Sequence, residues 1–246
     1  MRLFWIFLLA MPIAVPLQAA GPSPQPFTAV YVLKKGPITF GETRREVLVD
    51  GEGNHIFESV TRPRSVGKLL TSGQVVERSR WIVQGQGLVP LEYSYFNSGS
   101  KKNRDVHLSF DWRTRVITNT INGDPWRMPL EDGTLDRLLY QLQLMLDLEA
   151  GKTDISYPIA DGGKIKTYAL EMQGQEKIRT PLGSFDTLRL RLVRGKRTTT
   201  IWCAASLNFL PVRIEQRKED EGPINAVLES VNIGGIKLRT TDPDED

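Results

Sequence analysis

The sequence predicts a mainly β protein, in which a curved antiparallel meander forms an open or partly closed barrel with one long apolar helix against its concave side. Short segments of alternating apolar and polar residues follow one another along the chain, and most joints between them contain glycine. Only in residues 134–151 do apolar residues recur at helical spacing over a stretch long enough for a long helix. A single apolar helix in a sheet protein must be covered, which places it on the concave side.

The first 20 residues are typical of a secretory signal peptide. Arg2 precedes an apolar run over residues 3–17, and small residues follow this run. The run is shorter than the roughly 20 apolar residues of a membrane-spanning helix. This favours cleavage after Ala19 or Ala20 over retention as an N-terminal anchor. We therefore predict a periplasmic or secreted protein that has no integral membrane span after cleavage.

The mature chain is predicted to form a single β-rich domain over residues 27–236. Residues 21–26 form a proline-rich, flexible leader, and residues 237–246 form an acidic, disordered tail. Before the helix, we expect strands over residues 27–35, 38–50, 55–62, 74–84, 88–96, 106–112, 115–121 and 126–130, with a short helical turn over 64–72. After the helix, we expect strands over residues 154–160, 164–173, 175–180, 184–193, 196–204, 209–217 and 224–233.

The predicted helix has signals at both ends and apolar residues over more than half of its circumference. Thr134 is suited to cap the first amides, and Asp136 is favourable in the first turn beside the positive end of the helix dipole. Gly151 is suited to the left-handed conformation that ends a helix. The apolar positions at helical spacing are Leu135, Leu138, Leu139, Leu142, Met145 and Leu146.

The residue types needed for common catalytic and metal sites are scarce. His55 and His107 lie in separate predicted strands without a second metal ligand nearby, and Cys203 has no partner for an internal disulfide. No serine-hydrolase elbow or phosphate-binding loop is present, and the net charge of +3 is low for a nucleic-acid binder. We predict a protein that is not an enzyme and that uses no cofactor, metal or nucleic acid.

The main functional prediction is an apolar ligand, such as an acyl chain or another lipid-like envelope molecule, held in the half-open barrel. The residues predicted to contact this ligand are Leu138, Leu139 and Leu142 of the helix and Trp81, Trp112 and Trp202 of the strands. A more remote alternative is a hydrolase of envelope glycans or lipids, which would need two carboxylates facing each other. The candidates for such a pair are Asp105, Asp111 and Asp124.

Residues 188–192 alternate leucine with arginine, and Arg194, Lys196 and Arg197 continue the positive charge. In a strand, this alternation places leucines on one face and arginines on the other. A solvated face balanced by acids on neighbouring strands explains the pattern without a function. The alternative function is an envelope scaffold without a small-molecule ligand, which contacts an acidic partner through Arg189, Arg191 and Arg194.

The C-terminal half carries a resemblance to a known family. Residues 180–187 (TPLGSFDT), Trp202 and residues 209–215 (FLPVRIE) resemble the exported bacterial family named domain of unknown function 3108. The leucine-rich helix that opens with Asp136 fits the same family. The resemblance covers most of the mature chain and implies no established activity or catalytic residue. A curved sheet around an apolar helix is also similar, at the level of fold alone, to the periplasmic lipoprotein carriers.

Overall fold

The computed structural model describes residues 23–51, 54–70, 73–85, 87–98 and 104–240. The predicted signal peptide lies outside the described residues. Ser23 to Pro26, the described part of the leader, have no regular secondary structure, but Pro24 is buried. Pro24 lines a small cavity together with Met145 and Leu146.

The first half of the chain forms consecutive strands and one short helix. These elements are β1 (Phe27–Lys35), β2 (Ile38–Val49), β3 (His55–Pro63), α1 (Gly67–Leu70), β4 (Val75–Gln84), β5 (Gly87–Asn97), β6 (Arg104–Asp111), β7 (Val116–Ile121) and β8 (Asp124–Pro129). The second half contains the longer helix. Its elements are β9 (Leu135–Asp136), α2 (Tyr140–Glu149), β10 (Ile155–Ala160), β11 (Ile165–Thr180), β12 (Gly183–Arg194), β13 (Arg197–Ala204), η1 (Ala205–Leu207), β14 (Leu210–Lys218), β15 (Ile224–Ile233) and β16 (Ile236–Arg239).

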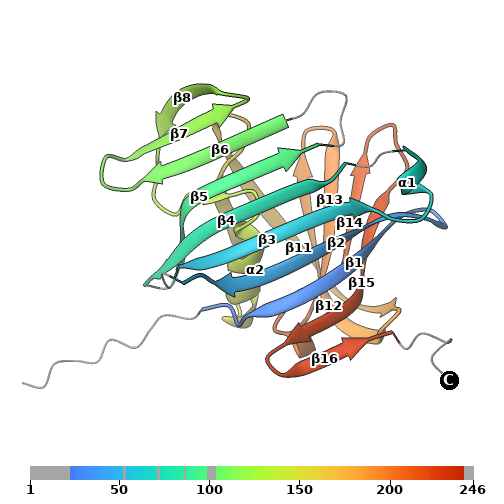
Figure 1. Ribbon diagram of the computed structural model, residues 1–246. Helices are drawn as coiled ribbons and strands as arrows, with labels where there is room; N and C mark the ends of the chain where they lie inside the picture. Colours follow the sequence, from blue (N-terminus) through green and yellow to red (C-terminus); the bar gives the residue numbers. More distant parts are fainter. Residues whose placement is uncertain (1–22, 52–53, 71–72, 86, 99–103, 241–246) are drawn as a thin grey trace, which may run out of the picture.

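The strands belong to one large sheet, which is mainly antiparallel as predicted. Its order runs from β8 back to β1, continues through β15, and then runs back from β14 to β9, while β16 pairs with β15. The sheet therefore consists of two meanders joined where β1 pairs with β15. Figure 1 shows the β1–β5 part in front of α2, with the β11–β15 part behind.

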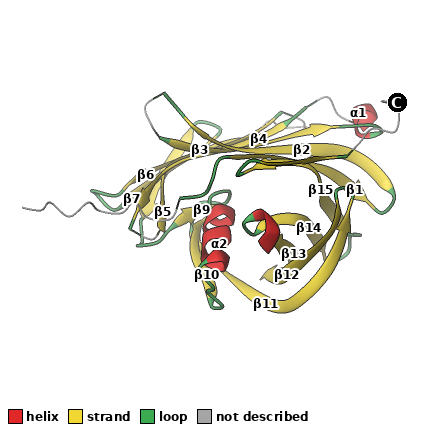
Figure 2. Cartoon of the chain, turned by 90° about the horizontal axis from the view of Figure 1, so that it is seen from below, coloured by secondary structure: helices red, strands yellow, loops and turns green. Residues whose placement is uncertain are grey.

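The curved sheet is not closed by hydrogen bonds between its two ends. β9 forms a short parallel pair with β10 and lies against β5, which is not its neighbour in the hydrogen-bonded order. Seen from below, the sheet curves around α2, and β6 and β7 extend beyond the curve (Figure 2). The prediction of an unclosed, curved sheet is confirmed.

Two strand predictions need correction. Residues 165–180 form one long strand, β11, because a bulge between Met172 and Gln175 absorbs the irregularity at Gly174, whose φ is +98°. The predicted tail is strand at its start, because β16 pairs with the end of β15. Gly234 and Gly235 both have positive φ and make the tight turn between these two strands. Residues 241–246 of the tail lie outside the described residues.

The longer helix is shorter than predicted and begins at Tyr140 rather than Thr134. Leu135 and Asp136 are extended and pair with Ile159 and Ala160 of β10. No side chain caps the helix, and Thr134, which we expected to do so, has a buried hydroxyl without a hydrogen-bond partner. The predicted end is confirmed, since Gly151 follows the helix with a φ of +75°.

α2 is buried on nearly all sides and belongs to the same core as the inward faces of the strands. Its polar members are paired: the Gln143 side chain accepts a hydrogen bond from the Leu88 amide at 2.9 Å and donates one to Asp147 at 3.0 Å. Tyr157 and Lys152 also donate hydrogen bonds to Asp147, each at 2.7 Å. Within the described ranges, no helix has the length and apolar character needed to cross a membrane.

Candidate functional site

Four of the six predicted ligand contacts lie together in the closed core. Leu138, Leu139, Leu142 and Trp81 all have 0% exposure, which makes them packing residues in this structure. The Trp81 ring stacks on His55 with ring centroids 4.4 Å apart, while its indole Nε1 is buried without a hydrogen-bond partner. Contact between these four side chains and a ligand therefore requires the interior to open, and it remains a prediction.

The other two predicted contacts lie at the margin of this core: Trp202 is 5% exposed, and Trp112 is half-buried against the core. Trp112 is half-buried beyond the end of β6, where its indole donates a hydrogen bond to the Pro90 carbonyl at 2.8 Å. Trp202 packs between Arg189 and Arg213, and its indole donates a hydrogen bond to Glu176 at 2.8 Å. Because Arg189 points away from the core, Trp202 lies on the outer face of the sheet. Contact between these two tryptophans and a ligand remains a prediction.

The arginine stripe is divided between the two faces of β12. Arg189 and Arg191 are on the outer face and form ion pairs with Glu176 at 3.5 Å and with Glu171 at 3.6 Å. Arg194 is an odd number of residues away from both, so it points to the same side as buried Leu190 and Leu192. The expectation that all three form one surface is wrong, although the acidic partner itself remains a prediction.

The contact between β9 and the β4–β5 hairpin, which we name the seam, is held by a buried carboxylate. Asp136 accepts a hydrogen bond from the Ser79 hydroxyl at 2.5 Å and from the amides of Leu138 and Leu139 at 2.8 Å each. Burial raises the pKa of Asp136 to about 6, although these three hydrogen bonds oppose the increase. Asp136 thus joins the free edge of the sheet to β4.

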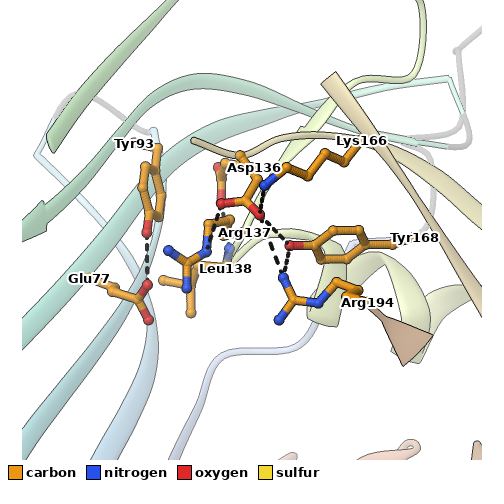
Figure 3. A network of polar contacts seen from close by, with 9 residues as sticks. Glu77, Tyr93, Asp136, Arg137, Leu138, Lys166, Tyr168 and Arg194 are labelled. Carbon is orange, nitrogen blue, oxygen red and sulfur yellow. Dashed lines mark hydrogen bonds and ion pairs between the residues drawn. The ribbon is translucent and has the colours of Figure 1, made fainter. Parts of the chain in front are cut away.

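Arg137 follows Asp136 and extends the seam toward the β10–β11 turn, which we call the open end of the barrel. Its guanidinium lies 6.0 Å from the centre of the Tyr95 ring and 3.6 Å from Asp161. On the opposite side of the seam, Tyr93 donates a hydrogen bond to Glu77 at 2.7 Å (Figure 3). Burial and the neighbouring Glu77 charge both raise the pKa of Tyr93, which keeps this hydroxyl protonated as a donor.

At the open end, Asp161 gathers several donors around one carboxylate. Lys166 donates to it at 2.9 Å and Tyr168 at 3.1 Å, and Arg194 lies 3.6 Å away while also contacting the Tyr168 hydroxyl. Figure 3 shows Lys166, Tyr168 and Arg194 converging. Burial by itself would raise the pKa of Asp161, but the hydrogen bond from Lys166 and the charges of Arg137 and Lys166 outweigh burial and lower it. Asp161 is therefore a fixed negative charge that orients cations.

Beside this cluster is a cavity of about 530 Å³, which we name the rim cavity. Its lining comes from the β10–β11 turn, the start of β11, the β12–β13 turn and the end of β14. The charged lining residues are Asp161, Lys166, Arg194, Lys196, Arg197 and Lys218, and the other lining residues include Tyr168 and Val193. Sequence analysis identified Arg194, Lys196 and Arg197 as part of the basic pattern, but not the other lining residues, which are brought together by strand order and have no common motif.

The remaining candidates for catalytic or metal-binding residues do not form a site. Asp105, Asp111 and Asp124 are exposed, and Asp111 accepts hydrogen bonds from the turn amides of Arg113 and Thr114. Burial raises the pKa of the Cys203 thiol, as expected for a cysteine that packs as a small apolar residue. Among the described residues, no three histidine, cysteine or acidic side chains gather as a metal site requires.

Comparisons with known proteins identify a family and a solved structure with a similar fold. The profile of the family described as "Protein of unknown function (DUF3108)" matches residues 28–229. A beta-barrel-like protein of domain of unknown function DUF1849 from Brucella abortus has a similar crystal structure, with a TM-score of 0.55, 11% identity, and coverage of 87% of this chain and 99% of that chain. A "putative lipoprotein" from Parabacteroides distasonis matches with a TM-score of 0.34 and 10% identity over 86% of this chain and 97% of that chain. No curated protein matches the chain.

Proposed function

Since the chain belongs to the DUF3108 family, whose description assigns no function, we propose a function from its own residues. The protein is a non-enzymatic periplasmic protein that binds a lipid-like ligand at the open end of its half-open barrel. The apolar part of this ligand lies against the interior beside α2, and its polar end lies at the rim cavity.

The rim cavity and its position over the core carry this proposal. A volume of about 530 Å³ is within the range of small-molecule sites, which is roughly 300–1,000 Å³. Tyr168 lines the cavity, and its ring packs edge-on against Tyr140 of α2 with ring centroids 5.3 Å apart. These two rings therefore connect the polar, accessible hollow to the apolar interior.

The seam supports the proposal because it offers a way for an acyl chain to enter. β9 meets the β4–β5 hairpin through side-chain contacts such as Ser79–Asp136, and Arg45 and Gln141 are joined in the same manner at 2.7 Å. These side-chain hydrogen bonds can separate without loss of a hydrogen-bonded strand ladder. Opening of the seam would make Leu138, Leu142 and Trp81 available to the ligand.

Photolabelling tests the proposal directly. The mature protein is irradiated with a fatty acid that carries a diazirine near its terminal methyl, and the labelled peptides are identified by mass spectrometry. We expect labels on peptides from α2, β9 and the start of β11. Labels confined to outer-face peptides, together with lipid-free protein after native purification, would contradict the proposal.

A matched pair of variants sharpens this experiment. Val193→Asp places a charge at the β12 edge of the rim cavity, whereas Val49→Asp places the same charge on β2, outside the lining of this cavity. The two valines are similarly exposed, at 47% and 53%. We expect Val193→Asp to reduce labelling of α2 severalfold and Val49→Asp to leave it unchanged. Equal labelling of the two variants would count against the rim cavity.

A further inference from the structure

The rim cavity contains a row of positive charges on adjacent strands. Arg194 of β12 is directly opposite Arg197 of β13, and Arg197 is directly opposite Lys218 of β14. Like charges at directly opposed positions repel each other and destabilise a sheet. All three residues line the rim cavity, so their repulsion is concentrated on one concave surface.

The nearby carboxylates neutralise this row of positive charges only in part. Asp161 is the single acidic residue of the lining, and it is already shared by Arg194 and Lys166. Lys218 pairs with Glu221, which lies outside the lining. Among the described residues, Arg197 forms no ion pair, and the nearby Glu221 charge that it senses is already paired with Lys218. A further negative charge in the cavity would therefore relieve the repulsion.

We propose that the rim cavity binds the phosphate group of an anionic lipid, held by Arg194, Arg197 and Lys218. Guanidinium groups bind phosphate through paired, charge-assisted hydrogen bonds, and an ammonium group adds a third contact. Asp161 and Tyr168 keep Arg194 in place by contacting its guanidinium. The Tyr168 ring supplies apolar lining for the first carbons of the lipid. This inference rests on the proposed function and specifies the head group of its ligand.

Calorimetric titration of the mature protein with three probes tests the inference. Dihexanoyl phosphatidic acid carries the phosphate and short chains, dihexanoylglycerol carries the same chains without phosphate, and sodium phosphate carries no chain. We expect the phosphatidic acid to bind about tenfold more tightly than either other probe. Equal affinity for inorganic phosphate and phosphatidic acid would assign the site to free phosphate and overturn the lipid head group.

Two double variants identify the contacts. Arg197→Gln/Lys218→Gln removes two charges from the rim cavity, and Arg189→Gln/Arg191→Gln removes two charges from the outer face of β12. The rim variant is expected to lose about tenfold in affinity for phosphatidic acid, and the outer variant less than about twofold. Equal losses in both variants, or no loss in the rim variant, would overturn the inference. Thermal melts verify that both variants fold.

The neutral probe separates this inference from the proposed function. Binding of dihexanoylglycerol to the wild-type protein with the same affinity as phosphatidic acid would overturn the phosphate site and leave the proposed lipid-binding function intact. Phosphate-dependent binding without any contribution from the chains would leave a site for free phosphate and overturn both the lipid head group and the proposed lipid-binding function. Unchanged binding of dihexanoylglycerol to the rim variant, with loss of phosphatidic acid, supports both.

Discussion

The interior beside α2 and the rim above it lie in contact, yet they are built in opposite ways. In the interior, Leu138 and Leu142 are wholly buried and surrounded by other apolar side chains. At the rim, Asp161 and several cations surround a hollow of about 530 Å³. Apolar residues at helical spacing therefore identify the core of this protein. Its accessible concave surface is instead made by charged residues near the ends of strands.

The largest effect is expected from shortening a buried side chain of α2, which tests how tightly the interior is packed. Leu142→Ala should lower the free energy of unfolding by about 3 kcal/mol, because it removes buried methyl groups and leaves a cavity. Leu48→Ala is the control, since Leu48 is 42% exposed, and it should cost about 0.5 kcal/mol or less. Urea denaturation measures both. A small loss for Leu142→Ala would mean that the interior already has room for a guest, which would weaken the contrast with the rim.

The second prediction concerns Asp136, the charged group that lies deepest at the seam. Its pKa is about 6 in the folded protein, above its ordinary value of 3.8, so the folded state binds this proton more tightly than the unfolded state. The contribution of Asp136 to stability is therefore greatest below about pH 4 and falls as the pH rises toward 7, by up to about 3 kcal/mol.

Asp136→Asn removes this titration while keeping a carbonyl oxygen for the amides of Leu138 and Leu139. The free energy of unfolding of the wild type, minus that of the variant, should therefore decrease between about pH 4 and pH 7. Urea denaturation at a series of pH values measures this difference. A difference that is constant with pH would show that Asp136 is not buried as a charge, and the seam would then resemble the solvated rim.

Much of the fold was predictable because its strands follow the period of two and most pair with their neighbours in the chain. The start of α2 was not, since an aspartate near the beginning of a leucine-rich segment also favours a helix. Asp136 instead accepts hydrogen bonds from two amides before the helix, while Leu135 and Asp136 pair with β10, which comes later in the chain. A long-range pairing of this kind leaves no local signal.

The candidate site was less predictable than the fold. The opposite orientation of Arg194 follows from counting residues along β12, so the sequence contained that information. The rim cavity is different, because Asp161, Arg197 and Lys218 come from separate turns and strand ends. Their proximity depends on the order of β10 to β14 and on the curvature of the sheet, neither of which is encoded in the spacing of these residues.

The smallest predicted change in the free energy of unfolding comes from replacing one of two arginines in the same strand. Arg194→Gln should lower the free energy of unfolding by about 1 kcal/mol, because Asp161 loses one cation but keeps Lys166 and Tyr168. Arg191→Gln should change it by less than about 0.5 kcal/mol, because the Arg191–Glu171 pair is exposed and screened by water. Urea denaturation in low salt gives both values. Equal effects would mean that the Asp161 cluster is as solvated as the outer face, and the physical distinction between these two basic surfaces would be lost.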